Sequence, residues 1–169
     1  FSDPIAEGPV IQEADLRSLA QGTTTDKVFE LTKKLSSRVD TPLVYMTYLN
    51  VLFKYGYDKF LQNAKDAGIS GVIVPDLPYE EKDELQSVAE KYDIDVISLI
   101  APTSEDRIKM IASDAKGFIY TVSSMGVTGM RNEIKTDLQS IVSHIKSVTD
   151  VPVAIGFGIN KPQQAKEFS

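Results

Sequence analysis

The sequence predicts an α/β fold in which helices cover a parallel sheet. Short apolar runs alternate with amphipathic stretches along the chain. The apolar runs are continuous instead of alternating with polar residues, which is typical of strands that are buried on both faces. Their centres lie between Val44 and Val153 at a mean spacing of about 27 residues, close to the length of one strand and its helix.

Two helices and one strand open the predicted series. Apolar residues recur every three or four positions in Val10–Gln21 and Thr25–Ser36, which predicts two helices. The β-branched and aromatic residues of Pro42–Tyr48 predict the first strand. The helix predicted over Tyr57–Ala67 has an apolar face and is followed by a glycine in the C-cap position.

The same alternation continues through the middle of the chain. Gly71–Pro75 and Asp95–Ile100 are short apolar runs that predict the second and third strands. Glu80–Tyr92 between them has apolar residues on one helical face. We expect Ser104 to cap the next helix with its side chain.

The last predicted elements are a strand, a helix and a strand. They cover Gly117–Val122, Thr136–Val148 and Val151–Ile155. Eight units of this length would need roughly 220 residues, near the roughly 250 residues of a TIM (β/α)8 barrel. Because a barrel cannot close on five strands, we expect an incomplete barrel that forms one partial domain over residues 1–169. An open five-stranded sheet is the alternative, although the Gly-x-Gly-x-x-Gly turn typical of such folds is absent.

The composition excludes several classes of protein. The net charge is −6 and the pI is about 4.8, which argues against nucleic acid or an anionic membrane as the main partner. The absence of Cys excludes disulfides and a thiol nucleophile, and the single His excludes a multi-histidine metal site. We find no apolar run long enough for a membrane span and no signal peptide, so we expect a cytoplasmic protein. The chain lacks an initial Met and stops at Ser169 within a helical pattern, so we expect it to be truncated at both ends.

Two glycine-containing loops follow the last two predicted strands. One contains Gly126 and Gly129, and the other reads Gly156-Phe157-Gly158. Glycine lets backbone N–H groups approach an anion closely, so the pair of loops favours a phosphate site over two simple turns.

Carboxylates and apolar side chains near the strand ends are further candidates. Asp3, Glu7 and Asp76 could act as acids or bases, or could serve only in turns and helix caps. Tyr120 could reach the mouth of a barrel, or could be a buried tyrosine with its hydroxyl satisfied. The apolar side chains suit a flat hydrophobic ligand or plain packing; they are Met46, Ile73, Leu99 and Phe157.

Four groups of segments carry a more specific signal. They read Phe-Ser-Asp-Pro-Ile-Ala-Glu-Gly-Pro-Val-Ile-Gln at 1–12, Met-Thr-Tyr-Leu-Asn at 46–50, Val-Pro-Asp-Leu-Pro at 74–78, and Gly-Val-Thr-Gly at 126–129 with Gly-Phe-Gly-Ile at 156–159. In this order they resemble the tryptophan synthase α chain family. The resemblance covers essentially the whole chain and would make the five strands the family's strands 3 to 7.

The resemblance implies a TIM-barrel lyase of tryptophan biosynthesis. The family cleaves indole-3-glycerol phosphate by a retro-aldol reaction into indole and glyceraldehyde 3-phosphate, without a cofactor. It assembles with a pyridoxal-phosphate β chain as an αββα heterotetramer, and indole passes between the chains. An alternative is a non-catalytic subunit that binds and activates a β chain. Another phosphate-binding barrel enzyme is a weaker alternative, because the segment Phe1–Pro4 argues against it.

Roles for individual residues also follow from the resemblance. Glu7 matches the catalytic carboxylate that holds the indole N–H, a position where the family most often has Asp. Tyr120 matches the tyrosine beside the glycerol portion of the substrate, and Thr128 matches the residue that bonds the catalytic carboxylate when its loop closes. Gly129 and Gly158 match backbone donors to the phosphate.

Two further groups complete the expected site. The positions that match the indole pocket are Phe157, Met46, Ile73 and Leu99. The positions that match the surface facing the β chain are Asp3, Pro4, Asn50 and Pro78. The family's principal acid/base glutamate would lie just upstream of Phe1, so we expect the 169 residues alone to be inactive.

Overall fold

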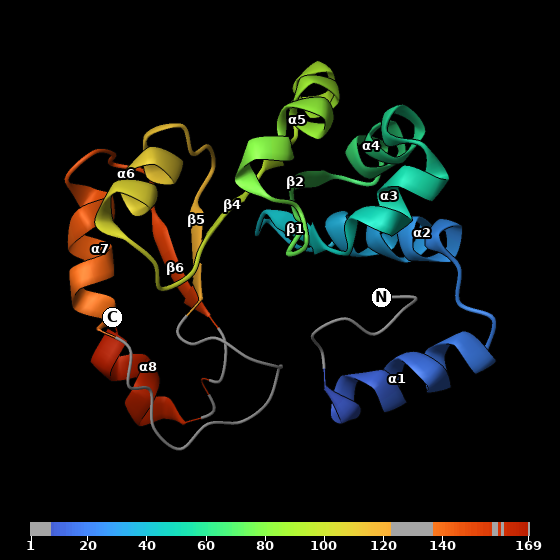
Figure 1. The fold of residues 1–169 in the computed structure, drawn as a ribbon. Coiled ribbons are helices and arrows are strands. Elements are labelled where there is room, and N and C mark those ends of the chain that lie inside the picture. The colour runs from blue at the N-terminus through green and yellow to red at the C-terminus, as the bar shows by residue number, and fades with distance from the viewer. Residues whose placement is uncertain (1–7, 123–136, 157–158, 160, 169) are drawn as a thin grey trace. The chain divides into compact units, whose positions relative to one another are not determined.

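The computed structural model of the chain describes residues 8–122, 137–156, 159 and 161–168 (Figure 1). These residues form two compact units: residues 13–97 make the first, and residues 98–168 with 8–12 make the second. Each unit contains a three-stranded sheet in which the paired strands are parallel. The parallel α/β class predicted from the continuous apolar runs is therefore confirmed.

The first unit is built on a sheet in the order β1-β2-β3. Its strands are β1 (Leu43–Met46), β2 (Ile69–Ile73) and β3 (Asp95–Val96). Its helices are α2 (Thr25–Ser36), α3 (Leu49–Tyr55), α4 (Tyr57–Asp66), α5 (Asp83–Ala89) and the 3-10 helices η1 (Tyr79–Glu81) and η2 (Glu90–Tyr92). Helix α1 (Pro9–Ala20) precedes them and has no buried residue.

The helices of this unit show where local sequence signals suffice and where they fail. Helix α2 has the predicted bounds, and the Thr24 side chain accepts a hydrogen bond from the Lys27 N–H at 3.3 Å at its start. Helix α3 was not predicted, because seven residues are too few for a clear periodicity. The single helix predicted over Glu80–Tyr92 is divided into η1, α5 and η2, and ends where Asp93 adopts a φ of 52°.

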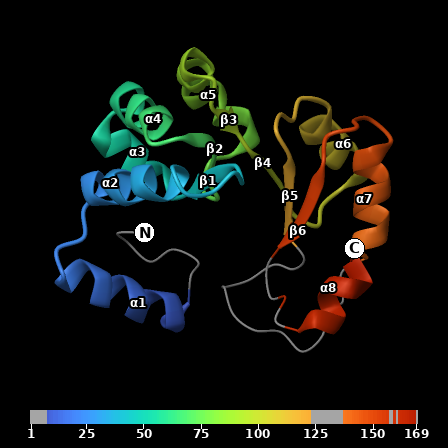
Figure 2. The same ribbon diagram turned by 180° about the vertical axis from the view of Figure 1, so that it is seen from behind.

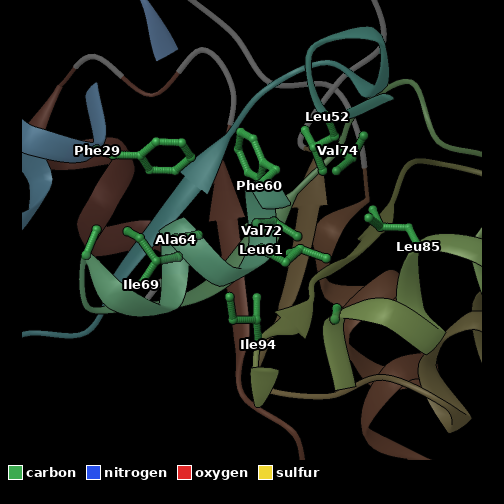
Figure 3. Packing of buried hydrophobic residues seen from close by; sticks show 12 residues of the cluster. Phe29, Leu52, Phe60, Leu61, Ala64, Ile69, Val72, Val74, Leu85 and Ile94 are labelled. Carbon is green, nitrogen blue, oxygen red and sulfur yellow. The ribbon is translucent and has the colours of Figure 1, made fainter. Parts of the chain in front are cut away.

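The core of the first unit lies between its sheet and its helices (Figure 3). Phe29 on α2 and Phe60 on α4 are 8% and 3% exposed, and their ring centroids lie 5.2 Å apart in an edge-to-face arrangement. Tyr45 on β1 adds a third ring at 6.2 Å from Phe60. Val72 on β2 and Leu61 on α4 are fully buried beneath them. This cluster fixes which face of the sheet is covered by helices.

A buried hydrogen-bond chain joins β1 to α2. The Tyr45 hydroxyl donates to Thr32 Oγ1 at 2.7 Å, and the Thr32 hydroxyl donates to the Val28 carbonyl oxygen at 2.8 Å. Burial raises the pKa of Tyr45 above its usual value. As the pH rises, Tyr45 therefore loses its proton in the unfolded chain before it does so in the folded protein. The contribution of protonated Tyr45 to the free energy of unfolding is complete below about pH 10 and declines above it.

We therefore expect Tyr45→Phe to destabilise the full-length protein by about 1 kcal/mol at pH 7, through loss of the hydrogen bond. The difference from the wild type should narrow above about pH 10, because only the wild type has this titrating group. Urea unfolding at pH 7 and in alkaline buffer measures both values. A difference that stays constant over this range would contradict the assignment.

The second unit has the sheet order β4-β5-β6. Its elements are β4 (Ser98–Ile100), α6 (Glu105–Ser113), β5 (Ile119–Val122), α7 (Leu138–Lys146), β6 (Val153–Gly156) and α8 (Pro162–Phe168). Helices α6 and α7 lie on one side of this sheet (Figures 1 and 2). Their apolar faces are buried, as predicted; the buried residues are Ile108, Ile111, Ala112, Leu138, Ile141 and Ile145.

Two predictions in this half of the chain need correction. The third predicted strand, Asp95–Ile100, is divided at Ile97: β3 pairs with β2, whereas β4 pairs with β5. The Ile97 N–H donates to the Val72 carbonyl oxygen at 2.9 Å, so the change of partner strand occurs directly after Ile97. Ser104 occupies the N-cap position of α6 but makes no side-chain capping bond. At α7, the capping side chain is Asp137, which accepts from the Ser140 N–H at 3.0 Å.

Candidate functional site

The candidate residues of the first sheet lie on the face away from its helices. Tyr45 and Val72 belong to the core cluster or pack against it, so their neighbours Met46 and Ile73 point to the opposite face. Met46 and Ile73 are partners in the parallel register of β1 and β2. Ile73 is 3% exposed, and Met46 is 43% exposed. The structure thus brings these two predicted ligand-pocket residues together at the carboxyl ends of neighbouring strands.

The second sheet likewise has one buried face and one face that carries candidate site residues. Ile119 and Thr121 on β5 are completely buried, whereas Tyr120 and Val122, which alternate with them, are half-buried on the other face. Leu99 on β4 and Ala154 on β6 are the register partners of Tyr120. Two more predicted site residues, Leu99 and Tyr120, are therefore adjacent on a face that presents both an apolar side chain and a phenol.

Tyr120 lies directly over Gly156 at the carboxyl end of β6. A Cβ atom added to Gly156 would lie 2.9 Å from Tyr120 Cε2 and closer still to the hydroxyl end of the ring. Only the absence of a side chain at Gly156 allows this ring position. Burial raises the pKa of Tyr120 above its usual value. Like any neutral tyrosine, its hydroxyl can donate a hydrogen bond to a ligand. The sequence placed Gly156 in a phosphate loop, and its contact with Tyr120 was missed.

Asp76 has a structural partner. It follows β2 in a turn closed by the bond from the Leu77 N–H to the Val74 carbonyl oxygen at 3.1 Å. Its carboxylate accepts from the Leu49 N–H at 2.9 Å, at the first residue of α3. A capping role of Asp76 is therefore observed, while a role as an acid or base stays a prediction. The capped helix, however, is one that begins 27 residues earlier in the chain.

Helix α3 presents an exposed face next to this turn. Asn50, Phe53 and Lys54 are exposed on it, with Phe53 at 71%, while Leu52 is fully buried. The Phe53 ring contacts Tyr57 at a centroid distance of 6.1 Å. Pro78, at the end of the turn after β2, is exposed as well. Phe53 is thus an exposed phenylalanine on the same short helix as Asn50, a predicted interface position.

Several predicted site residues cannot be placed. They lie outside the described residues and stay predictions; they are Asp3, Pro4, Glu7, Thr128, Gly129, Phe157 and Gly158.

The described part of the chain contains no cluster of His, Cys, Asp and Glu that could hold a metal ion.

His144 is half-buried on α7, with Nε2 3.5 Å from Glu105 Oε2, and Lys109 Nζ lies 2.5 Å from Glu105 Oε1. The hydrogen bond from Lys109 lowers the pKa of Glu105. None of the helices described is both long and apolar enough to cross a membrane.

Comparison with known proteins gives one consistent answer. The family model described as "Tryptophan synthase alpha chain" matches residues 1–169. The chain is 53% identical over 169 residues to the tryptophan synthase alpha chain of Lacticaseibacillus casei, covering 100% of this chain and 64% of that protein. It is 50% identical over 168 residues to that of Methanosarcina acetivorans, covering 99% of this chain and 60% of that protein. The chain therefore spans about 64% of the length of the first of these relatives.

Solved structures agree with the sequence matches. Tryptophan synthase subunit alpha from Campylobacter jejuni is similar with a TM-score of 0.87 and 40% identity, over 99% of this chain and 67% of that one. A chain from the tryptophan synthase a2b2 complex of Pyrococcus furiosus is similar with a TM-score of 0.87 and 36% identity, over 99% and 68% of the two chains. These similarities confirm the predicted fold class, an incomplete TIM (β/α)8 barrel.

Proposed function

This chain belongs to the tryptophan synthase alpha chain family, and from that premise we propose that the full-length protein is a lyase of tryptophan biosynthesis. Its reaction is the retro-aldol cleavage of indole-3-glycerol phosphate into indole and glyceraldehyde 3-phosphate. The observation that carries the proposal is the match of the family model to all 169 residues. That range includes both glycine-containing loops and the segment around Glu7.

The proposed chemistry needs protonation of the indole ring at C3 and removal of a proton from a glycerol hydroxyl. Glu7 holds the indole N–H and stabilises the positive charge that develops on the ring. The Tyr120 hydroxyl donates a hydrogen bond to the glycerol portion. Thr128 bonds the Glu7 carboxylate when its loop closes, which excludes water.

The rest of the proposed site binds the two ends of the substrate. Backbone N–H groups of Gly129 and Gly158 bind the phosphate. By the resemblance to the family, the positions proposed to contact the indole ring are Met46, Ile73, Leu99 and Phe157. The α chain uses no cofactor in this proposal, and pyridoxal phosphate belongs to the partner β chain.

We also propose that the protein binds a tryptophan synthase β chain in an αββα heterotetramer, in the cytoplasm. Relatives of known structure come from the a2b2 complex of Pyrococcus furiosus. The described residues that would face the β chain are Asn50, Phe53 and Pro78, which we call the partner surface. Phe53 supports this choice because an aromatic side chain that is 71% exposed on a helix favours burial against a partner.

An indole-release assay tests the proposal. The full-length protein should release indole from indole-3-glycerol phosphate, and adding a β chain should accelerate the release. The 169-residue polypeptide alone should release none, because the family's principal acid/base glutamate is expected upstream of Phe1. No release by the full-length protein, with or without β chain, would overturn the lyase. β-chain stimulation without any release would favour the non-catalytic alternative.

A further inference from the structure

The two parts of the partner surface come from different places in the chain. Asn50 and Phe53 lie on α3, which follows β1, whereas Pro78 lies in the loop that follows β2. A surface composed of two segments binds well only when their relative positions are fixed before the partner arrives. The described contacts between these segments therefore decide how well the surface is organised.

Helix α3 is a weak element by itself. It has seven residues, fewer than an isolated helix needs for stability in water. The residue at its N-cap is Tyr48, whose side chain makes no capping bond. Its first backbone N–H groups therefore need an acceptor from elsewhere in the molecule.

The Asp76 carboxylate supplies that acceptor. The 2.9 Å bond from the Leu49 N–H is charge-assisted, and the negative charge lies at the positive end of the helix. Pro75 and the bond from the Leu77 N–H to the Val74 carbonyl oxygen rigidify the turn that presents the carboxylate. The rigid turn thus fixes the position of the Asp76 carboxylate, and the bond to this carboxylate holds the first turn of α3 in place.

An apolar contact region supports the same junction on its buried side. Leu52 on α3 and Val74 in the turn are 0% and 3% exposed and belong to one core cluster (Figure 3). Burial alone leaves a short helix free to rotate and fray at its first turn, since apolar contacts are not directional. The hydrogen bond from Leu49 to Asp76 removes that freedom.

We propose that Asp76 is a positioning residue for the partner surface. Its carboxylate fixes α3 against the turn 74–77, and this organises the two segments that would contact the β chain. The proposal rests on the proposed function, since that is what identifies the partner. Asp76 itself acts through Leu49 and does not need to touch the β chain.

Binding of a tryptophan synthase β chain to the full-length protein, measured by titration calorimetry, tests this role. We expect Asp76→Ala and Asp76→Ser to raise the Kd by about tenfold, since neither side chain brings an acceptor oxygen within reach of the Leu49 N–H. Asp76→Asn keeps an oxygen acceptor and should stay within about twofold of the wild type. Thr24→Ala is the matched control, because it removes a side-chain cap from α2 in the same unit.

The possible outcomes separate the two proposals. A raised Kd in the Ala and Ser variants, with rescue by Asn and no change in Thr24→Ala, supports the positioning role. A Kd that is unchanged in Asp76→Ala, or raised equally in Thr24→Ala, overturns it while β-chain binding by the wild type stands. Absence of any binding by the wild type overturns the proposed partner, and the role of Asp76 with it. If Asp76→Ala does not fold, the comparison of the Kd of Asp76→Ser with that of Asp76→Asn decides whether Asp76 has the positioning role.

Discussion

Replacing Gly156 by Val in the full-length protein is expected to lower kcat/KM for indole release by about a hundredfold. The position of the Tyr120 ring over Gly156 leaves no space for a Cβ atom, and valine adds three carbon atoms there. Because β6 is held in register with β5, the ring must move instead of the backbone. A displacement of about 1 Å at a substrate-contacting group is enough for a loss of this size.

A double-mutant cycle separates this contact from general damage to the sheet. Tyr120→Leu removes the ring, so Gly156→Val should cost less stability in that background than in the wild type. We expect the two changes to differ from additivity by about 1–3 kcal/mol in urea unfolding. Gly71→Val on β2 also crowds its surroundings, since a Cβ atom there would lie 3.2 Å from Asp95 O, but its effect should be additive with that of Tyr120→Leu. Additive effects at Gly156 and Tyr120 would contradict a direct contact.

The second large effect is expected at Glu7. Glu7→Gln keeps the size of the side chain and an oxygen that can accept the indole N–H, but it removes the negative charge. Since the proposed role is to stabilise positive charge that appears only during the reaction, kcat should fall by about 10²–10⁴-fold with little change in KM. Steady-state indole release without β chain measures both constants.

Two controls make the result at Glu7 specific. Glu7→Asp retains the carboxylate on a side chain that is one methylene shorter, so we expect it to keep kcat within about tenfold of the wild type. Glu13→Gln removes one negative charge from α1 and should leave kcat unchanged. If Glu7→Gln kept more than about a tenth of the wild-type kcat, Glu7 would not be the charge-stabilising group.

The sequence predicted the elements whose signals are local. Helix α2 has the predicted bounds because its cap, its amphipathic face and its end all lie within Thr24–Ser37. The five apolar runs all contain strands for the same reason. Helix α3 was missed because it has only seven residues and because its first N–H is capped by Asp76, a residue far away in the sequence. The division of Asp95–Ile100 was missed because it depends on which strands pair on either side of Ile97.

The candidate site was predictable to a similar extent. Two pairs of predicted site residues are register partners on neighbouring parallel strands: Met46 with Ile73, and Leu99 with Tyr120. The sequence could predict this, because candidate residues of a parallel sheet gather toward the carboxyl ends of its strands. The contact between Tyr120 and Gly156 was not predictable, since it depends on the side-chain direction across two paired strands. The exposure of Phe53 was not predictable either, because it follows from a helix that the sequence did not reveal.

The bond between Asp76 and Leu49 has a consequence for the order of folding events. It joins residues 27 positions apart, so it cannot form until β2, with the turn that follows it, has paired with β1. Contacts that close such a loop cost chain entropy before they return any stability. Helix α3 is therefore expected to consolidate after the β1–β2 pair, whereas α2, with its local cap, can form early. The part of the molecule that would meet a β chain is thus completed late, by a long-range contact.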